Sequence, residues 1–152
     1  MQTAVHGLYG VRISPWLDFQ RDHAPRVVEE GGKAKRLAQA DVVADFVDDL
    51  LTADPNALVV VLGDLNDFQF SAPVGTLEAV GLSDLFATLP EAERYSYVFQ
   101  GNAQTLDHLL VSPSLQSALV PGSFDVVHVN AEFAKQASDH DPQLARLLVS
   151  AT

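Results

Sequence analysis

The feature that most constrains the fold is a run of five large apolar residues, Leu58–Leu62, which follows a long amphipathic segment. The run is rich in β-branched valine and does not alternate with polar residues, so it predicts a strand buried on both faces. Over residues 33–53, apolar side chains recur at helical spacing, and Pro55 and Asn56 follow, which predicts a helix that ends before them. A helix, a short turn and a buried strand indicate a layered α/β domain.

The remaining segments fit one domain over residues 1–152, which is an ordinary domain length. Gly101 and Asn102 tolerate positive φ angles, so residues 100–103 predict a hairpin turn that joins strands over 95–99 and 105–111. Residues 1–32 are less regular, and we expect one irregular strand within 5–16 and a loop over 18–32. Further short helices are expected over 74–80, 83–89 and 113–119, and further strands over 124–129 and 143–149.

Composition excludes several classes of function. The net charge is −11, with nine Lys and Arg residues against twenty acidic residues, which argues against tight non-specific coating of nucleic acid. The same charge permits metal-dependent hydrolysis, because a bound divalent cation reverses the local sign. The chain has no cysteine, so disulfides and thiolate metal sites are excluded. We find no secretory signal in residues 1–30 and no run long enough to span a membrane.

The first candidate site follows the buried strand, in the segment Gly63-Asp64-Leu65-Asn66-Asp67. Side chains two apart in extended chain point the same way, so Asp64 and Asn66 are expected to face one crevice. The carboxyl ends of buried strands are where α/β sheets place ligands. The same spacing also occurs in ordinary turns, whereas a calcium-binding EF-hand loop is excluded because Phe68 and Gly75 stand where ligands are required.

Two further segments supply an aspartate and a histidine. In Ser138-Asp139-His140-Asp141, adjacent side chains point in different directions, so Asp139 could hold a metal while His140 faces a substrate; a solvated loop is the alternative. Asp107 lies in an apolar run, where an unpaired carboxylate is costly, and a histidine is its natural partner. His108 and His128 are interpreted as structural residues.

These three segments, in this order, resemble the endonuclease/exonuclease/phosphatase superfamily of metal-dependent phosphoesterases. The resemblance rests on Gly63–Asn66, Leu106–His108 and Ser138–His140, covers residues 33–150, and is closest to the large extracellular bacterial nucleases of that superfamily. It matches residues 1–32 poorly. The resemblance suggests a secreted protein, although this chain shows no signal peptide.

The resemblance implies a role for each site residue. Asp64, Asn66, Asp107 and His140 would be catalytic. Asp64 would orient or deprotonate the attacking water, or protonate the leaving group, and Asn66 would hold the phosphate and the developing charge. His140 would contact the phosphoryl oxygen or serve as general base, and Asp107 would orient it. Asp139, Asp64 and Asn66 would hold Mg²⁺, or Mn²⁺ or Ca²⁺. The reaction would be in-line attack of water on a phosphate ester or nucleic acid; nuclease and phosphatase activity both remain open.

The resemblance is to the C-terminal half of the superfamily's domain. The fold would be half of a four-layer α/β sandwich, a mixed β-sheet with helices on one face. We find no counterpart for the Asn, the metal-binding Glu and the Tyr that the first half should supply. An uncovered sheet face would be a large apolar patch, so we expect a homodimer that completes the sandwich. A non-catalytic, dimerising half-domain or fragment is the alternative function.

Overall fold

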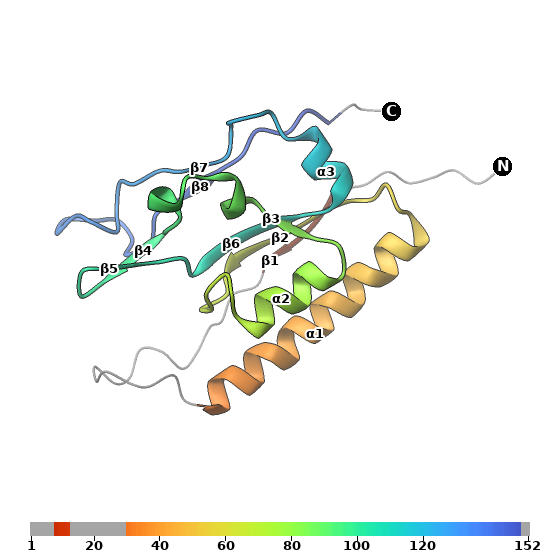
Figure 1. Cartoon of the computed structure of the whole chain (residues 1–152), viewed down its shortest axis with the longest axis horizontal. Helices are drawn as coiled ribbons and strands as arrows, with labels where there is room; N and C mark the ends of the chain where they lie inside the picture. The colour runs from red at the N-terminus through yellow and green to blue at the C-terminus, as the bar shows by residue number, and fades with distance from the viewer. Residues whose placement is uncertain (1–7, 13–29, 150–152) are drawn as a thin grey trace.

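The centre of the molecule is a four-stranded mixed sheet with the strand order β1-β2-β6-β3 (Figure 1). β1 and β2 are parallel, whereas β6 is antiparallel to both β2 and β3. The computed structural model of the chain describes residues 8–12 and 30–149. The strands of this sheet are β1 (Leu8–Arg12), β2 (Leu58–Asp64), β3 (Ser83–Asp84) and β6 (Asp107–Val111).

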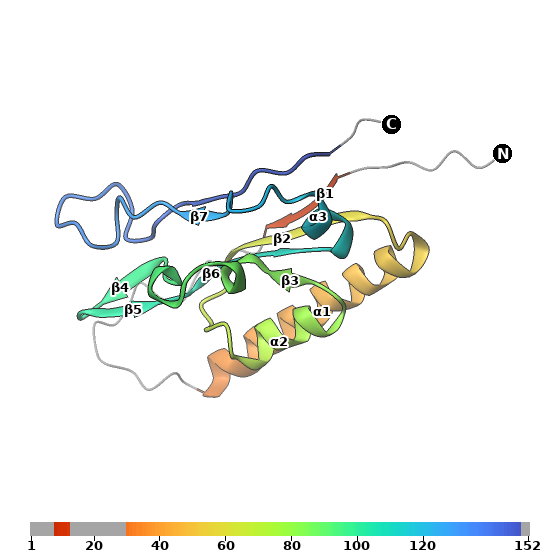
Figure 2. The ribbon, with the colours of Figure 1, turned by 45° about the horizontal axis from the view of Figure 1, so that its top comes forward.

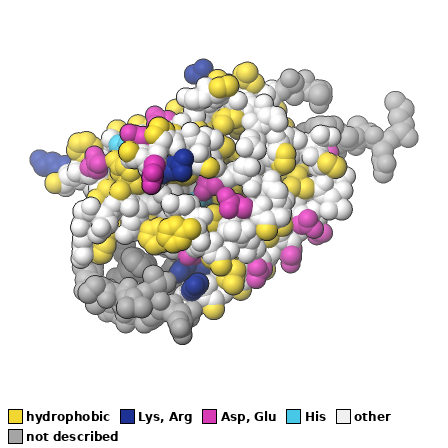
Figure 3. Space-filling view, in the orientation of Figure 1, with side chains coloured by type: hydrophobic (Ala, Val, Ile, Leu, Met, Phe, Trp, Pro, Cys, Tyr) yellow, Lys and Arg dark blue, Asp and Glu magenta, His cyan; other side chains and the backbone are white. Residues whose placement is uncertain are grey.

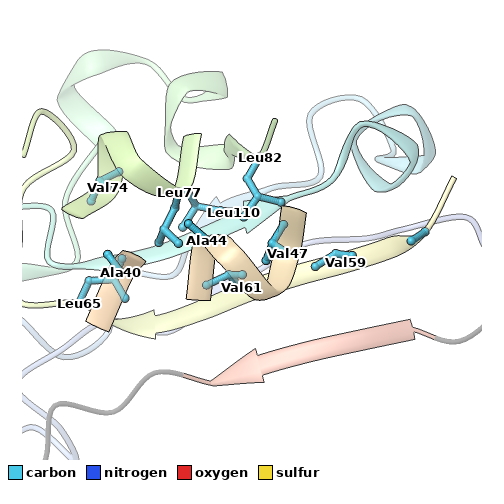
Figure 4. Packing of buried hydrophobic residues seen from close by; sticks show 11 residues of the cluster. Ala40, Ala44, Val47, Val59, Val61, Leu65, Val74, Leu77, Leu82 and Leu110 are labelled. Carbon is cyan, nitrogen blue, oxygen red and sulfur yellow. The ribbon is translucent and has the colours of Figure 1, made fainter. Parts of the chain in front are cut away.

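Two helices, α1 (Glu30–Ala53) and α2 (Ala72–Ala79), lie together on one side of the sheet (Figures 1 and 2). α1 matches the helix expected over 33–53 but begins three residues earlier and includes Gly31 and Gly32. The apolar side chains of both helices pack on Val59 and Val61 of β2, neither of which is exposed (Figure 4). The helix predicted from the amphipathic pattern therefore packs on the strand predicted from the apolar run.

The opposite face of the sheet packs on later segments of the chain. Because neighbouring strand residues point to opposite faces, Val60 and its register partner Val111 face away from α1 and α2. They join a second apolar cluster that includes Phe86, Leu115 and Phe124. The sheet thus lies between two apolar clusters, and the expected bare face is partly covered; Leu62 stays 38% exposed.

The hairpin differs from the expected pairing. β4 (Tyr97–Phe99) pairs with β5 (Asn102–Gln104) and not with β6, which joins the central sheet. The two-residue turn between β4 and β5 has positive φ angles at Gln100 and Gly101, as a tight hairpin with the native twist requires. The β4–β5 hairpin is therefore short, and the chain after β5 pairs with β2 as strand β6.

The remaining elements are short. Residues 83–89 form β3 and a 3-10 helix, η1 (Leu85–Thr88), where a helix was expected, because the Asp84 side chain accepts a hydrogen bond from the Phe86 amide and caps a single turn. A second 3-10 helix, η2 (Glu91–Glu93), precedes β4. The others are α3 (Pro113–Ala118), β7 (Asp125–Val126) and β8 (Gln143–Leu144), and the last two pair with each other.

The expected strand within residues 5–16 is present as β1, and most of the loop expected over 18–32 lies outside the described residues. Among the helices that the structure describes, none has the length and apolar character needed to cross a membrane.

Candidate active site

Strand pairing brings the first two candidate residues together. Asp64 is the last residue of β2 and Asp107 is the first residue of β6, and the two are direct register partners. An antiparallel pair places the end of one strand beside the start of the other. Like charges that face each other across a sheet are destabilising, so two facing carboxylates call for a nearby cation or proton.

Asn66 holds the carboxylate of Asp64. Its backbone N–H donates to Asp64 Oδ1 at 2.9 Å, and its side-chain Nδ2 donates to Oδ2 at 3.0 Å. This arrangement needs a left-handed backbone at Asn66, with φ of 51°, which asparagine adopts more readily than most residues. Burial raises the pKa of Asp64 and the charge of Asp107 adds to that effect, although the Asn66 hydrogen bonds oppose it. Asp64 is therefore a carboxylate with an enhanced tendency to take up a proton.

His140 enters the same site from the C-terminal part of the chain. Its Nδ1 lies 2.5 Å from Asp107 Oδ2, and Ser96 Oγ donates to the same oxygen at 2.7 Å. The hydrogen bond with Asp107 raises the pKa of His140 despite partial burial, and the charges of Asp64 and Asp139 raise it further. Because Nδ1 faces Asp107, Nε2 is the ring nitrogen that can form a hydrogen bond with a substrate.

The β4 strand fixes the position of His140. Tyr97 forms an antiparallel bridge with His140, and their rings lie 4.7 Å apart between centroids. The next residue, Asp141, donates its backbone N–H to the Ser96 carbonyl at 2.7 Å. A histidine 33 residues from its aspartate is thus placed by strand-like contacts with residues 96 and 97.

Asp141 anchors this segment, a role that sequence reasoning missed. Its Oδ1 accepts hydrogen bonds from the backbone amides of residues 129–131 at 2.7–3.1 Å, and its Oδ2 lies 3.0 Å from His128 Nδ1. Burial alone would raise the pKa of Asp141, but these hydrogen bonds outweigh burial and lower it. The sequence signal for this role is the acidic residue between His140 and Pro142, because a carboxylate can accept hydrogen bonds from the free backbone amides of a turn.

A second buried pair supports the loop that carries Asn66. His108 Nδ1 lies 2.6 Å from Asp84 Oδ2, and its Nε2 lies 2.8 Å from the Asp67 carbonyl oxygen. Arg36 of α1 contacts the Asp67 carboxylate at 2.5 Å. His108 is fully buried, in agreement with its interpretation as a structural residue.

The structure brings together three of the five candidate residues as one group. Asp64, Asp107 and His140 each place a ligand atom so that all three atoms lie within 4.8 Å of one another. Asn66 lies beside this group through its contacts with Asp64. Asp139 is exposed and lies outside the group. Two carboxylates that lie this close together suit a hard divalent cation such as Mg²⁺ or Mn²⁺, so these donors fit the metal that the resemblance implies.

Comparison with solved structures identifies the same architecture in known phosphoesterases. A 3'-5' exonuclease from Neisseria meningitidis aligns with a TM-score of 0.62 at 20% identity, over 79% of this chain and 56% of the exonuclease. A mannosyl-6-phosphatase from Bacteroides thetaiotaomicron aligns with a TM-score of 0.55 at 24% identity, over 78% of this chain and 47% of the phosphatase. The chain therefore spans about half the length of these proteins.

A comparison with curated proteins finds no match. The profile of the endonuclease/exonuclease/phosphatase family, however, matches residues 12–140, well over half of the chain. The match starts at the end of β1, earlier than the sequence resemblance over residues 33–150. On this evidence the chain belongs to the endonuclease/exonuclease/phosphatase family.

Proposed function

We propose that this chain is a phosphoester hydrolase whose reaction takes place at the group formed by Asp64, Asp107 and His140. The observation that carries the proposal is the convergence of three segments, distant in sequence, on ligand atoms within 4.8 Å of one another. Family membership supports the same reaction class, since the similar structures include an exonuclease and a phosphatase.

The proposed reaction divides the work among these residues. The oxygen of a water molecule forms a bond to phosphorus, Asp64 accepts the proton of that water, and the ester P–O bond breaks. A solvent water protonates the departing alkoxide, and the proton on Asp64 returns to solvent. Protonated His140, held by Asp107, donates from Nε2 to a phosphoryl oxygen and stabilises charge that develops in the transition state. Asn66 keeps Asp64 oriented and supplies an amide to the phosphate.

A divalent cation completes the proposed site. We assign Asp64, Asn66 and Asp139 as its ligands, with Mg²⁺ as the preferred ion and Mn²⁺ or Ca²⁺ as substitutes. Mg²⁺ is commonly bound by one or two carboxylates together with water and substrate oxygens, which suits so small a ligand set. When bound, the cation would neutralise charge on the phosphoryl group. Asp139 directly precedes His140 in the chain, which keeps it near the site.

A hydrolysis assay tests the proposal. The substrates are bis-p-nitrophenyl phosphate and p-nitrophenyl phosphate, each with Mg²⁺ and with excess EDTA. We expect Mg²⁺-dependent release of p-nitrophenolate that falls about 10²- to 10⁴-fold in His140→Ala. Asp49→Asn, at an exposed position on α1, is the matched control and should keep full activity. Activity that survives both EDTA and His140→Ala would reject the assignment.

We further propose a homodimer formed through the sheet face that α1 and α2 leave uncovered. Leu62 is 38% exposed on that face and stands opposite half-buried Leu109, so an apolar strip remains beside the second cluster. Light scattering should give twice the chain mass at micromolar concentration, and Leu62→Asp should give the single mass. A monomer would contradict this part of the proposal. A dimer without hydrolysis would instead favour the non-catalytic half-domain.

A further inference from the structure

A pair of aromatic rings leads from His140 to the surface. The Tyr97 ring lies 4.7 Å from the His140 ring, and the Phe99 ring lies 6.3 Å from the Tyr97 ring with an interplanar angle of 11°. Residues two apart in a strand point to the same face, so β4 presents both rings on one side. Phe99 is 46% exposed. We call Tyr97 and Phe99 the aromatic platform.

The aromatic platform belongs to the surroundings of the reacting groups. Tyr97 lies against His140 both as its partner in an antiparallel bridge and through its ring. The platform therefore begins beside the atoms that would carry out hydrolysis and ends in solvent at Phe99. A ring bound against the platform would lie on the side chains that lead from His140 to the surface.

A second aromatic pair follows Asn66 in the chain. The rings of Phe68 and Phe70 stack at 5.3 Å with an interplanar angle of 11°, and Phe70 is 79% exposed. Four residues of chain keep the Cα atoms of Phe70 and Asn66 within about 14 Å of each other. On the face shown in Figure 3, hydrophobic side chains gather over the β4–β5 hairpin and over the segment that leads into α2. Exposed aromatic rings thus occur on two segments that adjoin the site.

The chain has few free cationic side chains with which to bind the successive phosphates of a polyanion. The chain carries nine cationic side chains against twenty acidic ones. Two of the cations are already engaged within the protein, Arg36 by the Asp67 carboxylate and Arg94 by the carbonyl oxygens of residues 87 and 89. Contacts with successive phosphates are therefore few, and affinity for a substrate must come from the site itself and from uncharged contacts.

Support of the hairpin alone does not account for the exposed rings. On the same face of β5, the register partners of Tyr97 and Phe99 are Gln104 and Asn102, which are polar. An aromatic ring that served only to stabilise the hairpin would be expected to pack on an apolar cross-strand neighbour. Phe99 instead stacks on Tyr97 of its own strand and is 46% exposed, which leaves ring surface open to solvent.

We propose that the aromatic platform stacks on a nucleobase next to the scissile phosphate, which makes base-bearing phosphate esters the preferred substrates over sugar phosphates. The inference rests on the proposed hydrolase function and narrows its substrate class. Every nucleobase has a flat π-face, so stacking of this kind tolerates different sequences. A single-stranded or terminal nucleotide suits it, because an unpaired base can leave its own stack.

The test compares two oligonucleotides that differ by one base. Both are short single strands with the same sequence, and one carries an abasic tetrahydrofuran residue beside the scissile phosphate. For Phe99→Ala we expect kcat/KM to fall about 5- to 150-fold on the complete strand and to stay nearly unchanged on the abasic one. Phe99→Trp should restore activity on the complete strand. Phe46→Ala is the control, because Phe46 is 48% exposed on α1.

The outcomes separate the two proposals. Equal losses of kcat/KM on both oligonucleotides would mean that Phe99 only supports the hairpin. No loss of kcat/KM on either oligonucleotide would mean that Phe99 does not contact the substrate. Either result overturns the inference. If no variant hydrolyses either strand, the proposed function fails, and quenching of a 2-aminopurine nucleotide still tests stacking. Quenching by the parent chain and by Phe46→Ala, but not by Phe99→Ala, would support the platform, whereas equal quenching by all three would refute it.

Discussion

Removal of the Asp84 carboxylate is expected to destabilise the central sheet strongly. Asp84 is 6% exposed and pairs with His108, which is 1% exposed. Burial lowers the pKa of His108, but the hydrogen bond and charge of Asp84 outweigh burial and raise it. Asp84→Ala would therefore leave a buried imidazole without its carboxylate.

The expected magnitude follows from two lost interactions. Breaking a buried pair by removing one partner costs about 3–5 kcal/mol in the free energy of unfolding. The Phe86 amide also loses its acceptor, which adds about 1 kcal/mol. A domain of this kind is stable by about 5–15 kcal/mol, so the variant should lose a large fraction of its stability.

The pH dependence has a defined sign. A histidine whose pKa is raised by folding stabilises the folded state fully below the unfolded value of 6.5, and that contribution is lost as the pH rises through the folded pKa. The difference between the parent chain and Asp84→Ala should therefore be larger at pH 6 than at pH 9. Urea unfolding followed by circular dichroism measures it, with exposed Asp49→Ala as control. A loss below about 1 kcal/mol at pH 6 would show that the buried Asp84–His108 pair does not stabilise the fold.

Three further outcomes are expected. In Asp107→Asn the pKa of His140 should fall, because the charge and hydrogen bond that raise it are weakened; an NMR titration of the imidazole that shows no shift would contradict the pairing. Asp141→Ala removes the acceptor of three backbone amides, so hydrogen exchange of residues 129–131 should accelerate while that of β2 stays slow. Gly101→Ala forces a side chain into a backbone with φ of 80° and should cost about 1–2 kcal/mol by urea unfolding; an unchanged midpoint would argue against this turn.

The parts of the fold that the sequence predicts well are those with strong local patterns. Helix α1 carries apolar residues at helical spacing and strand β2 carries an unbroken apolar run, and both form within a few residues of the expected bounds. Strands β7 and β8 are two residues long, although their apolar segments predict six or seven. Apolar side chains of those segments pack on Val60 and Leu115 in the second cluster. Such packing does not require a long run of backbone hydrogen bonds between strands.

The pairing of strands could not be read from local patterns. The sequence indicates a turn near Gly101, but whether the next strand pairs with β4 or with β2 depends on contacts made far along the chain. The observed choice also creates the site, because pairing of β6 with β2 is what places Asp107 opposite Asp64.

Some site residues could be predicted from local sequence patterns, whereas others depend on contacts between distant segments. Asp107 was found because a carboxylate in an apolar run needs a partner, and the structure gives it His140. Asp141 and Tyr97 were missed because their roles, as an amide cap and as a ring against His140, depend on segments that meet only in three dimensions.

The central claim is that Asp64, Asp107 and His140 act as one unit in phosphoester hydrolysis. A double-mutant cycle of Asp64→Asn and His140→Ala, measured as Mg²⁺-dependent kcat/KM on bis-p-nitrophenyl phosphate, tests it most directly. Groups that act as a unit give strongly non-additive effects. The double variant should lose little more activity than either single variant. Two large losses that simply multiply, or two single variants with undiminished activity, would mean that the three residues do not act together.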